Sequence, residues 1–332
     1  MTEFEESFDE KTVLITGGAG AIGSNLTAEV AKLPTEEVIV LDDFSSGYRW
    51  LLSHKDKITV VSGSVLDEEK LRYVFKKGVD VVFHLAAHFA NKNSVEHPQR
   101  DLKVNGLGTL KVLEYANLVD VDRFVYASSG CGVYGHDSTL PYSEKDYSLQ
   151  LDTPYQVTKL LGELYSNYFH NIYNMPIVNA RFFNSFGPGE VPGKYRNVIP
   201  NFFYWAEQGQ ELPITGSGTE TRDWTYVDDI VQGLMQMAIK PQAVGESFNL
   251  ATGHETRVID MAQMVNSRVG NEGGITYVGR REWDKKTRIV GSIDKAQRVL
   301  DYQPKVSFEE GLDRYQSWFE ANFEQIEEDA EF

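Results

Sequence analysis

The sequence has little cysteine and no long hydrophobic run. Its 332 residues include a single cysteine, Cys131, so an internal disulfide is excluded. No run approaches the roughly 18 apolar residues of a membrane-spanning helix, and the first residues, MTEFEESFDEK, are acidic where a signal peptide would be basic and then apolar. We therefore expect a cytoplasmic protein without a membrane partner.

Positive charge is also scarce. The chain carries 32 Lys and Arg against 49 Asp and Glu, a formal net charge of -17. Such a charge repels phosphate backbones, which argues against a nucleic-acid partner. Part of the acidic excess gathers at the two ends, and we expect residues 1–10 and 324–332 to be solvated acidic tails.

The first half of the chain alternates short apolar, β-branched runs with helical patterns, which predicts an α/β fold with a doubly wound parallel sheet. The predicted strands are 12–16, 37–41, 58–62, 80–84, 123–127 and 177–182. The predicted helices are 22–32, 67–75, 102–117 and 154–173. This domain spans residues 11–185.

The pattern changes after residue 186. Turn clusters such as GPGEVPGKYRN and TGSGTETRD interrupt shorter elements, which predicts a smaller α+β region over 186–323. Part of 225–252 could return to the first domain. We expect a ligand to bind in a cleft between the two regions.

A glycine-rich turn links the first predicted strand to the first predicted helix. Gly17, Gly20 and Gly23 allow a tight turn and close approach of a pyrophosphate to the helix N-terminus. Asp42 follows 19 residues beyond Gly23, where a carboxylate accepts hydrogen bonds from ribose hydroxyls and repels a 2′-phosphate. Asp43 adds to that repulsion. The pattern predicts a Rossmann domain that binds NAD, although Asp42 could instead cap a turn.

A second motif lies at the start of the helix predicted over 154–173. Thr153 suits the N-cap and Gln156 completes a capping box, which places Tyr155 and Lys159 four residues apart on one face. A phenol of pKa about 10 is only about 0.1% ionised at pH 7, and a neighbouring ammonium lowers that pKa. The pair is a candidate catalytic dyad, although such spacing also occurs in ordinary helix packing.

With these motifs the chain resembles the extended short-chain dehydrogenases/reductases, and among them the nucleotide-sugar epimerases and dehydratases typified by UDP-galactose 4-epimerase. The resemblance runs through nearly the whole chain. It includes FHLAA at 83–87, NSVEHP at 93–98, VNGLGTL around Asn105, VYG at 133–135, ARFFNSFGPGE at 180–190, NVIP at 197–200, GSGTETRDWTYVDD at 216–229 and REWD at 281–284.

The resemblance implies functional residues at matching positions. Further cofactor contacts would come from Ala21, Ile22, Ser64, Val65, Leu85, Ala86, Ala87, Asn105, Tyr155 and Lys159. A sugar nucleotide would contact Ser129, Gly130, Asn184, Asn197, Val198, Arg222, Arg281 and Asp284. The two arginines would neutralise the diphosphate, because each guanidinium offers a planar fork of donors. Without the surrounding motifs, either arginine could equally form a surface ion pair.

The chain departs from the family where a hydroxyl is expected. Relatives carry Ser or Thr three residues before the Val of VYG, and that position is Gly130. Ser129 or a water could replace the hydroxyl, the reaction could differ, or activity could be lost. The acidic residues that dehydratases and decarboxylases carry next are Cys131 and Gly132 here, which favours epimerisation.

The resemblance therefore implies an NAD-dependent nucleotide-sugar epimerase, most simply a 4-epimerase, in which Tyr155, Lys159 and Ser129 are catalytic. Polysaccharide biosynthesis is the usual setting of such enzymes. The alternatives are a nucleotide-sugar dehydratase or oxidoreductase of the same fold and a catalytically silent NAD-binding module. His84 and His88 straddle a strand end without matching ligands, so we expect no metal site.

Relatives pair through the two helices that correspond to 102–117 and 154–173, so we expect a homodimer. Leu160, Leu164, Tyr168 and Phe169 recur at helical spacing and could line the contact. The same stripe could instead pack inside the monomer.

Overall fold

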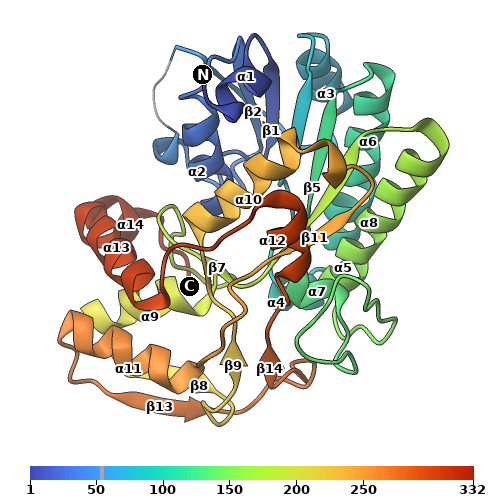
Figure 1. Ribbon diagram of the computed structural model, residues 1–332. Coiled ribbons are helices and arrows are strands. Elements are labelled where there is room, and N and C mark those ends of the chain that lie inside the picture. The colour runs from blue at the N-terminus through green and yellow to red at the C-terminus, as the bar shows by residue number, and fades with distance from the viewer. Residues whose placement is uncertain (53–55) are drawn as a thin grey trace.

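The computed structural model describes residues 1–52 and 56–332 and is built around a parallel sheet (Figure 1). Its seven strands lie in the order β11-β6-β5-β4-β1-β2-β3, and every neighbouring pair is parallel. The strands are β1 (Thr12–Thr16), β2 (Glu37–Asp42), β3 (Ile58–Ser62), β4 (Val81–His84), β5 (Arg123–Ser129), β6 (Ile177–Phe182) and β11 (Ser247–Leu250). The doubly wound α/β fold is confirmed.

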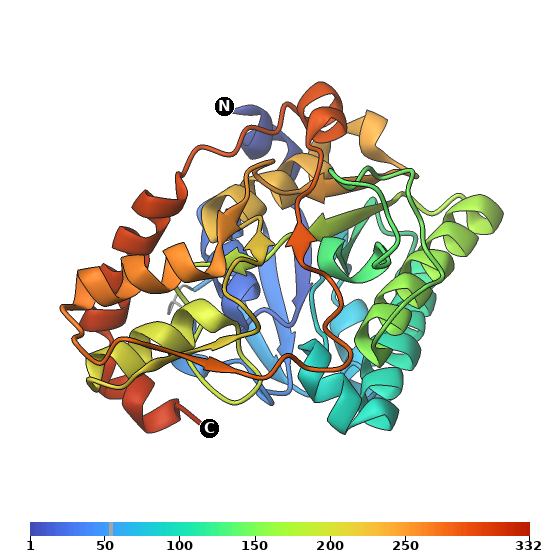
Figure 2. The same ribbon diagram turned by 90° about the horizontal axis from the view of Figure 1, so that it is seen from below.

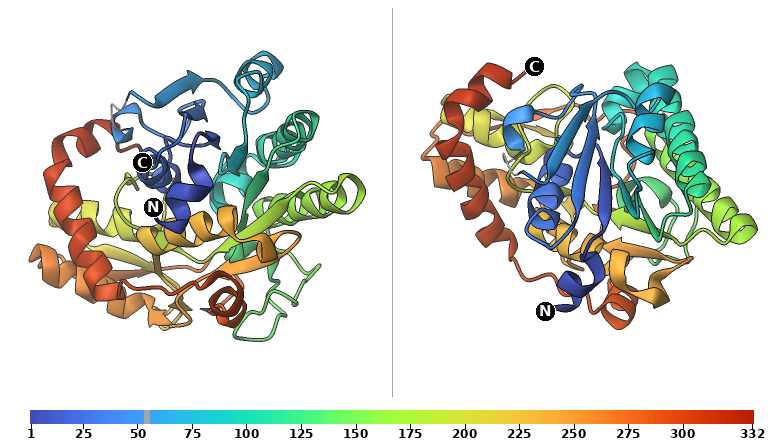
Figure 3. Two further views of the ribbon diagram at one scale, coloured as in Figure 1. Left: turned by 45° about the horizontal axis from the view of Figure 1, so that its top comes forward. Right: turned by 90° about the horizontal axis from the view of Figure 1, so that it is seen from above.

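Alternate residues of β1 face two different cores. Val13 and Ile15 pack with α2 (Ala21–Val30) and α10 (Val227–Ile239), whereas Leu14 packs with α3 (Glu68–Phe75), α6 (Thr109–Leu118) and α8 (Pro154–Tyr173). Figure 3 shows these helices on both sides of the sheet. All five residues of β1 are buried, because helices cover both faces of the sheet. A strand in such a sheet has a mostly apolar sequence without polar alternation.

The smaller region contains short strands and helices (Figure 2). A parallel pair joins β8 (Leu212–Thr215) to β13 (Ile275–Val278), β7 (Ser185–Phe186) pairs with β10 (Thr225–Tyr226), and β9 (Thr221–Arg222) lies between β12 (Thr256–Arg257) and β14 (Arg288–Ile289). The helices here are α9 (Val198–Glu207), α11 (Val258–Val269) and α13 (Phe308–Ala321), whereas α12 (Asp294–Leu300) packs against β11 and α10 of the sheet domain. Within 225–252, α10 and β11 return to the sheet domain.

The segment predicted as one helix over 102–117 is more complex. It begins as a π-helix, η2 (Leu102–Gly108), and continues as α6. π-helical turns are frequent at functional sites, and η2 holds Asn105 in the core.

The remaining elements of this domain are short. Two short helices precede η2, α4 (Asn91–Glu96) and α5 (Pro98–Asp101), and α7 (Gly130–Val133) follows β5. Short 3-10 turns occur at η1 (Arg49–Leu51) and η3 (Pro241–Ala243).

The two acidic ends are folded, so the interpretation of 1–10 and 324–332 as solvated tails is wrong. They form α1 (Glu3–Phe8) and α14 (Phe323–Asp329), which bury Phe8 and Ile326 in the main core. The Trp50 indole donates to Asp329 Oδ2 at 2.6 Å. Phe4 and Phe323 also pack against this core, so apolar side chains dock both acidic helices. None of the helices in the described ranges is long and apolar enough to cross a membrane.

Candidate active site

A cleft of about 760 Å³ runs along the carboxyl ends of the strands and between the two regions. Ligands of open α/β sheets bind at this edge, where the βα loops converge. The loop after β1 lines one end of the cleft, and residues of β9 and of the segment after β13 line the other. The cleft therefore joins the predicted cofactor site to the predicted substrate site.

The glycine-rich loop has the close packing that its sequence predicts. Gly17 has a φ of +71°, and a Cβ there would lie 2.6 Å from the backbone nitrogen of Ala86. A Cβ at Gly23 would lie 2.1 Å from the carbonyl oxygen of Gly17. Gly20 is the N-cap of α2 and lines the cleft, so the helix N-terminus opens onto it. This arrangement fits a dinucleotide pyrophosphate.

Asp42 ends β2 and lines the cleft beside Asp43. Its carboxylate accepts hydrogen bonds from Ala19 N at 2.9 Å and from Phe44 N at 2.8 Å. Burial raises the pKa of Asp42, and these two hydrogen bonds oppose that rise. Asp42 thus caps its turn and also presents a carboxylate at the predicted ribose position.

Most of the other predicted cofactor contacts lie on the cleft. They are Ala21, Ile22, Ser64, Val65, Leu85, Ala86 and Ala87. Asn105 is different, because its amide holds the backbone of His88 from behind, accepting from His88 N at 2.7 Å and donating to His88 O at 3.2 Å. Asn105 is buried and does not line the cleft, so in this structure it positions the loop, and its predicted contact with the cofactor stays a prediction.

The predicted dyad stands at the middle of the cleft. Thr153 caps α8 by accepting from Gln156 N at 3.4 Å, and the Lys159 Nζ atom lies 5.6 Å from the centre of the Tyr155 ring. Lys159 donates to the carbonyl of Ala127 at 2.8 Å. The start of α8 therefore sets both side chains against the end of β5.

The electrostatics of the dyad differ from the sequence-based expectation. Burial lowers the pKa of Lys159 to about 8, although the Asp101 carboxylate opposes this change. Burial also raises the pKa of Tyr155 well above its ordinary value, and the Asp101 carboxylate adds to the rise. A hydrogen bond with Ser129 acts in the opposite direction. The protein by itself thus holds Tyr155 as a neutral phenol, because desolvation outweighs stabilisation of the phenolate.

Ser129 and Gly130 are placed differently by the structure. Ser129 ends β5 and lines the cleft together with Tyr155. Gly130 does not line the cleft, and a Cβ there would lie 2.0 Å from Cε2 of Phe183. A side chain at Gly130 would therefore point toward Phe183 rather than into the cleft, and the predicted contact of Gly130 with substrate stays a prediction.

The predicted substrate residues lie at the far end of the cleft. They are Asn184, Asn197, Val198, Arg222, Arg281 and Asp284. Asn184 has a φ of +28° and donates to the carbonyl of Asp223 at 3.0 Å, while the Cys131 thiol approaches its Oδ1 at 3.5 Å. A thiol is a weak donor, so the hydrogen bond to the carbonyl of Asp223 is the stronger of the two contacts of Asn184.

The guanidinium groups of the two arginines at the substrate end retain N–H donors that a ligand could use. Arg222 lies 3.8 Å from the Asp284 carboxylate and donates to the carbonyl of Thr221 at 2.8 Å. The Arg281 guanidinium lies 5.4 Å from the centre of the Trp283 ring. Two guanidiniums at one end of a cleft suit a diphosphate.

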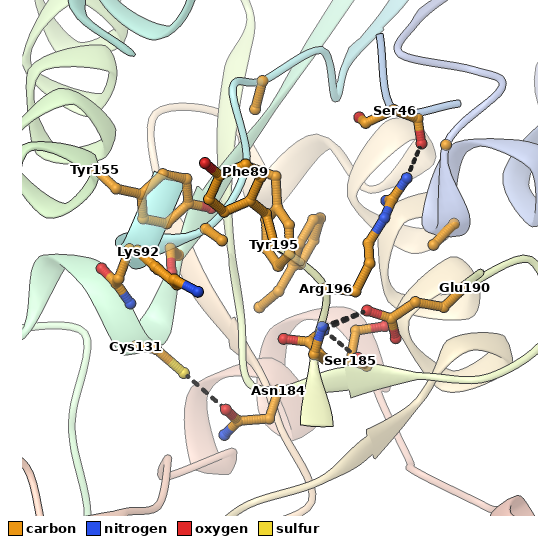
Figure 4. Close-up of a pocket in the computed structure, with 18 of the residues that line it drawn as sticks. Ser46, Phe89, Lys92, Cys131, Tyr155, Asn184, Ser185, Glu190, Tyr195 and Arg196 are labelled. Carbon is orange, nitrogen blue, oxygen red and sulfur yellow. Dashed lines mark hydrogen bonds between the residues drawn. The ribbon is translucent and has the colours of Figure 1, made fainter. Parts of the chain in front are cut away.

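Several cleft residues were not predicted from the sequence (Figure 4). They are Ser46, Phe89, Lys92, Glu190, Tyr195 and Arg196. Glu190 accepts from Asn197 Nδ2 at 2.7 Å, and burial raises its pKa to about 7. Two of these residues lie next to motifs given above, since Arg196 directly precedes NVIP and Lys92 directly precedes NSVEHP. The sequence did not indicate that their side chains line the cleft.

Within the described ranges no cluster of three His, Cys, Asp or Glu side chains could hold a metal ion. His84 forms hydrogen bonds with Thr16 at 2.7 Å and Thr109 at 3.0 Å, and burial lowers its pKa to about 3. It is therefore a neutral core residue that ties β4 to β1 and α6.

Comparison with known proteins identifies similar chains. The model of the NAD dependent epimerase/dehydratase family matches residues 13–251. A solved epimerase from the thermophilic methanogen Methanothermobacter thermautotrophicus is 62% identical with a TM-score of 0.98, and the match covers 99% of this chain and 98% of that one.

Curated relatives include proteins with two different activities. The UDP-glucose 4-epimerase of Mycolicibacterium smegmatis is 32% identical over 310 residues, which covers 92% of this chain and 97% of that protein. The UDP-N-acetyl-alpha-D-glucosaminuronate decarboxylase of Bacillus cytotoxicus is 30% identical over 321 residues, which covers 93% of this chain and 98% of that protein.

Proposed function

The chain belongs to the NAD dependent epimerase/dehydratase family, and on that basis we propose that it is a nucleotide-sugar 4-epimerase. Its cofactor is NAD. The observation that carries the proposal is one continuous cleft in which Tyr155, Lys159 and Ser129 lie between the glycine-rich loop and the two arginines. A sugar nucleotide anchored by its diphosphate would place its sugar beside Tyr155.

Each residue has a distinct part in the reaction. Bound NAD supplies the acceptor for the hydride of the sugar C4 position. Tyr155 would act as the base for the C4 hydroxyl once the positive charges of Lys159 and of the bound nicotinamide lower its pKa, and the Ser129 hydroxyl would hold the same oxygen and pass the proton. Lys159, fixed on the carbonyl of Ala127, would hold the nicotinamide ribose, and its ammonium would favour the phenolate of Tyr155 in the complex.

The diphosphate clamp permits epimerisation. While Arg222 and Arg281 hold the diphosphate, the neutral keto-sugar can rotate and present its other face for return of the hydride. Tyr155 then gives the proton back to the C4 oxygen. The cycle consumes no external cofactor, because the hydride that leaves C4 returns to C4.

A decarboxylase or dehydratase of the same fold is the second candidate, because a decarboxylase is among the relatives at 30% identity. Such reactions call for an acid or base beyond hydride transfer. The four residues after Ser129 are Gly130, Cys131, Gly132 and Val133, which supply no carboxylate. This composition supports epimerisation over the second candidate.

Tyr155→Phe tests the proposal. Positioned proton transfer contributes about 100- to 10,000-fold, so interconversion of the C4 epimers should fall at least 100-fold while NAD remains bound. Tyr73→Phe, an exposed tyrosine on α3, is the matched control and should behave as the unaltered protein. Conversion by Tyr155→Phe at the unaltered rate would refute the role of Tyr155, and steady consumption of added NAD would indicate an oxidoreductase.

A further inference from the structure

Lys92 has an unusual position in the cleft. It lies in α4, whose neighbouring side chains hold the start of α8: Tyr155 N donates to Ser94 Oγ at 3.1 Å, and Thr153 Oγ1 donates to Asn91 Oδ1 at 2.6 Å. These two bonds flank Lys92 in the sequence and fix α4 against the catalytic tyrosine. The helix that carries Lys92 is therefore anchored to the start of α8, and Lys92 lines the same cleft as Tyr155.

The side chain of Lys92 is directed into the cavity. Figure 4 shows it between Tyr155 and Cys131 and pointing toward Tyr195. Its Nζ atom lies 5.9 Å from the centre of the Tyr195 ring. The side chain is half-buried, so water solvates its ammonium only in part.

The other lysines of the cleft have partners. Lys159 donates to Ala127 O, Lys286 donates to Cys131 O at 2.7 Å, Lys194 pairs with Glu96 at 2.9 Å and Lys285 pairs with Asp152 at 2.8 Å. Among the residues that the structure describes, Lys92 has no carboxylate within 4.0 Å and no side-chain hydrogen bond. It is thus a positive charge without a partner beside Tyr155.

The nearby carboxylates are already engaged. Glu96 accepts from Tyr195 at 2.6 Å as well as from Lys194, and Asp101 is fully buried behind the cleft, where it accepts from Thr158 and Asn105. A partly desolvated ammonium is stabilised by an anion. A neutral sugar offers only hydroxyl groups to Lys92. In the proposed complex the diphosphate binds to Arg222 and Arg281 at the far end of the cleft.

We infer that Lys92 selects a nucleotide sugar whose sugar carries a carboxylate, such as a hexuronate. In a hexuronate the carboxylate is attached to C5, the ring carbon next to the reacting C4, so it comes close to Lys92 when C4 faces Tyr155. The flexible stem of lysine lets the ammonium follow the carboxylate between poses. The inference rests on the proposed function, because it names the substrate class of that site.

Binding tests the inference without requiring turnover. UDP-glucuronate and UDP-glucose are titrated into NAD-loaded Tyr155→Phe protein and into the same protein carrying Lys92→Met, Lys92→Arg or Lys76→Met. Lys76 is an exposed lysine at the end of α3 and serves as the matched control. A charge-assisted hydrogen bond corresponds to about 10- to 100-fold in affinity.

We expect UDP-glucuronate to bind about 10- to 100-fold more tightly than UDP-glucose, Lys92→Met to abolish that preference, and Lys92→Arg and Lys76→Met to retain it. Equal affinity for the two ligands, or an equal loss of both in Lys92→Met, would overturn the inference and leave the epimerase proposal standing. Loss of carbon dioxide from UDP-glucuronate in the unaltered protein, with the binding preference intact, would instead overturn the epimerase proposal.

Discussion

Gly130 and Phe183 are in such close contact that a Cβ atom on Gly130 would lie 2.0 Å from Cε2 of the Phe183 ring. The residue at the position that the VYG motif indicates therefore faces the protein interior. Ser129, one residue earlier, faces the cleft and Tyr155. We propose that Ser129 supplies the hydroxyl that the family pattern calls for, one position earlier in the sequence.

Ser129→Ala should lower turnover about 10- to 100-fold, because the C4 oxygen would lose a hydrogen bond that is formed beside Tyr155. NAD binding should not change, since the glycine-rich loop is untouched. Initial rates of epimerisation and a titration of NAD measure the two effects. An unchanged rate would mean that a water, rather than Ser129, completes the site.

Gly130→Ser should destabilise the protein rather than add activity. Gly130 is not in the left-handed region, but its Cβ position is occupied by the Phe183 ring, and overpacking of this kind costs about 1–3 kcal/mol. Denaturant unfolding measures the loss. Adding Phe183→Leu should recover part of it by making room. A fully stable Gly130→Ser protein would show that the α7 turn adapts freely.

Exposed apolar side chains on α8 and η2 indicate a dimer contact. The residues exposed on these elements are Val157, Leu164, Tyr168, Ile172, Tyr173, Leu102 and Leu107. Leu160 and Phe169, which the sequence pattern also suggested, are buried inside the monomer and cannot contribute. We predict a homodimer that Leu164→Glu converts to monomer, while Tyr73→Glu on α3 does not. Sedimentation at micromolar concentration measures the mass, and a monomeric unaltered protein would contradict the prediction.

Glu190 should make stability depend on pH. Burial raises the pKa of Glu190 to about 7 in the folded protein. Because this lies above the ordinary value of 4.5, the protonated carboxyl favours the fold at acid pH, and this contribution is lost as pH rises through about 7. At about 1.36 kcal/mol per pKa unit, the loss is at most roughly 3 kcal/mol.

Glu190→Gln removes the titrating group and keeps an oxygen that can accept from Asn197. Between pH 5 and pH 8 the unaltered protein should lose free energy of unfolding relative to Glu190→Gln. Denaturant unfolding of both proteins at the two pH values gives the difference. The same pH dependence in both proteins would show that Glu190 ionises freely.

The sequence predicted the site best where the residues that form it are close together in the chain. Gly17, Gly20 and Gly23 lie on one turn, and Tyr155 and Lys159 on one helix, so spacing alone brings each set together. The sequence did not predict the direction of side chains that is set by packing against residues far away in the chain. The orientation of Asn105 depends on a π-helix that no pattern indicates.

Lys92 and Glu190 illustrate the same limit within the cleft. Lys92 lies on the cleft through α4, which two hydrogen bonds tie to the start of α8, and the buried carboxylate of Glu190 accepts a hydrogen bond from Asn197. The acidic ends were misjudged for a related reason. Charge dominates their composition, yet apolar residues such as Phe8 and Ile326 are buried in the main core.

Isotope labelling tests the central claim most directly. NAD-loaded protein is incubated with UDP-glucose or UDP-glucuronate carrying deuterium at C4, and the product is examined by nuclear magnetic resonance. We predict the C4 epimer with its deuterium still at C4 and no hydrogen taken from water at any ring carbon, because the same hydride leaves and returns. Hydrogen from water at C3 or C5, or loss of deuterium from C4, would contradict a 4-epimerase that acts by transient oxidation.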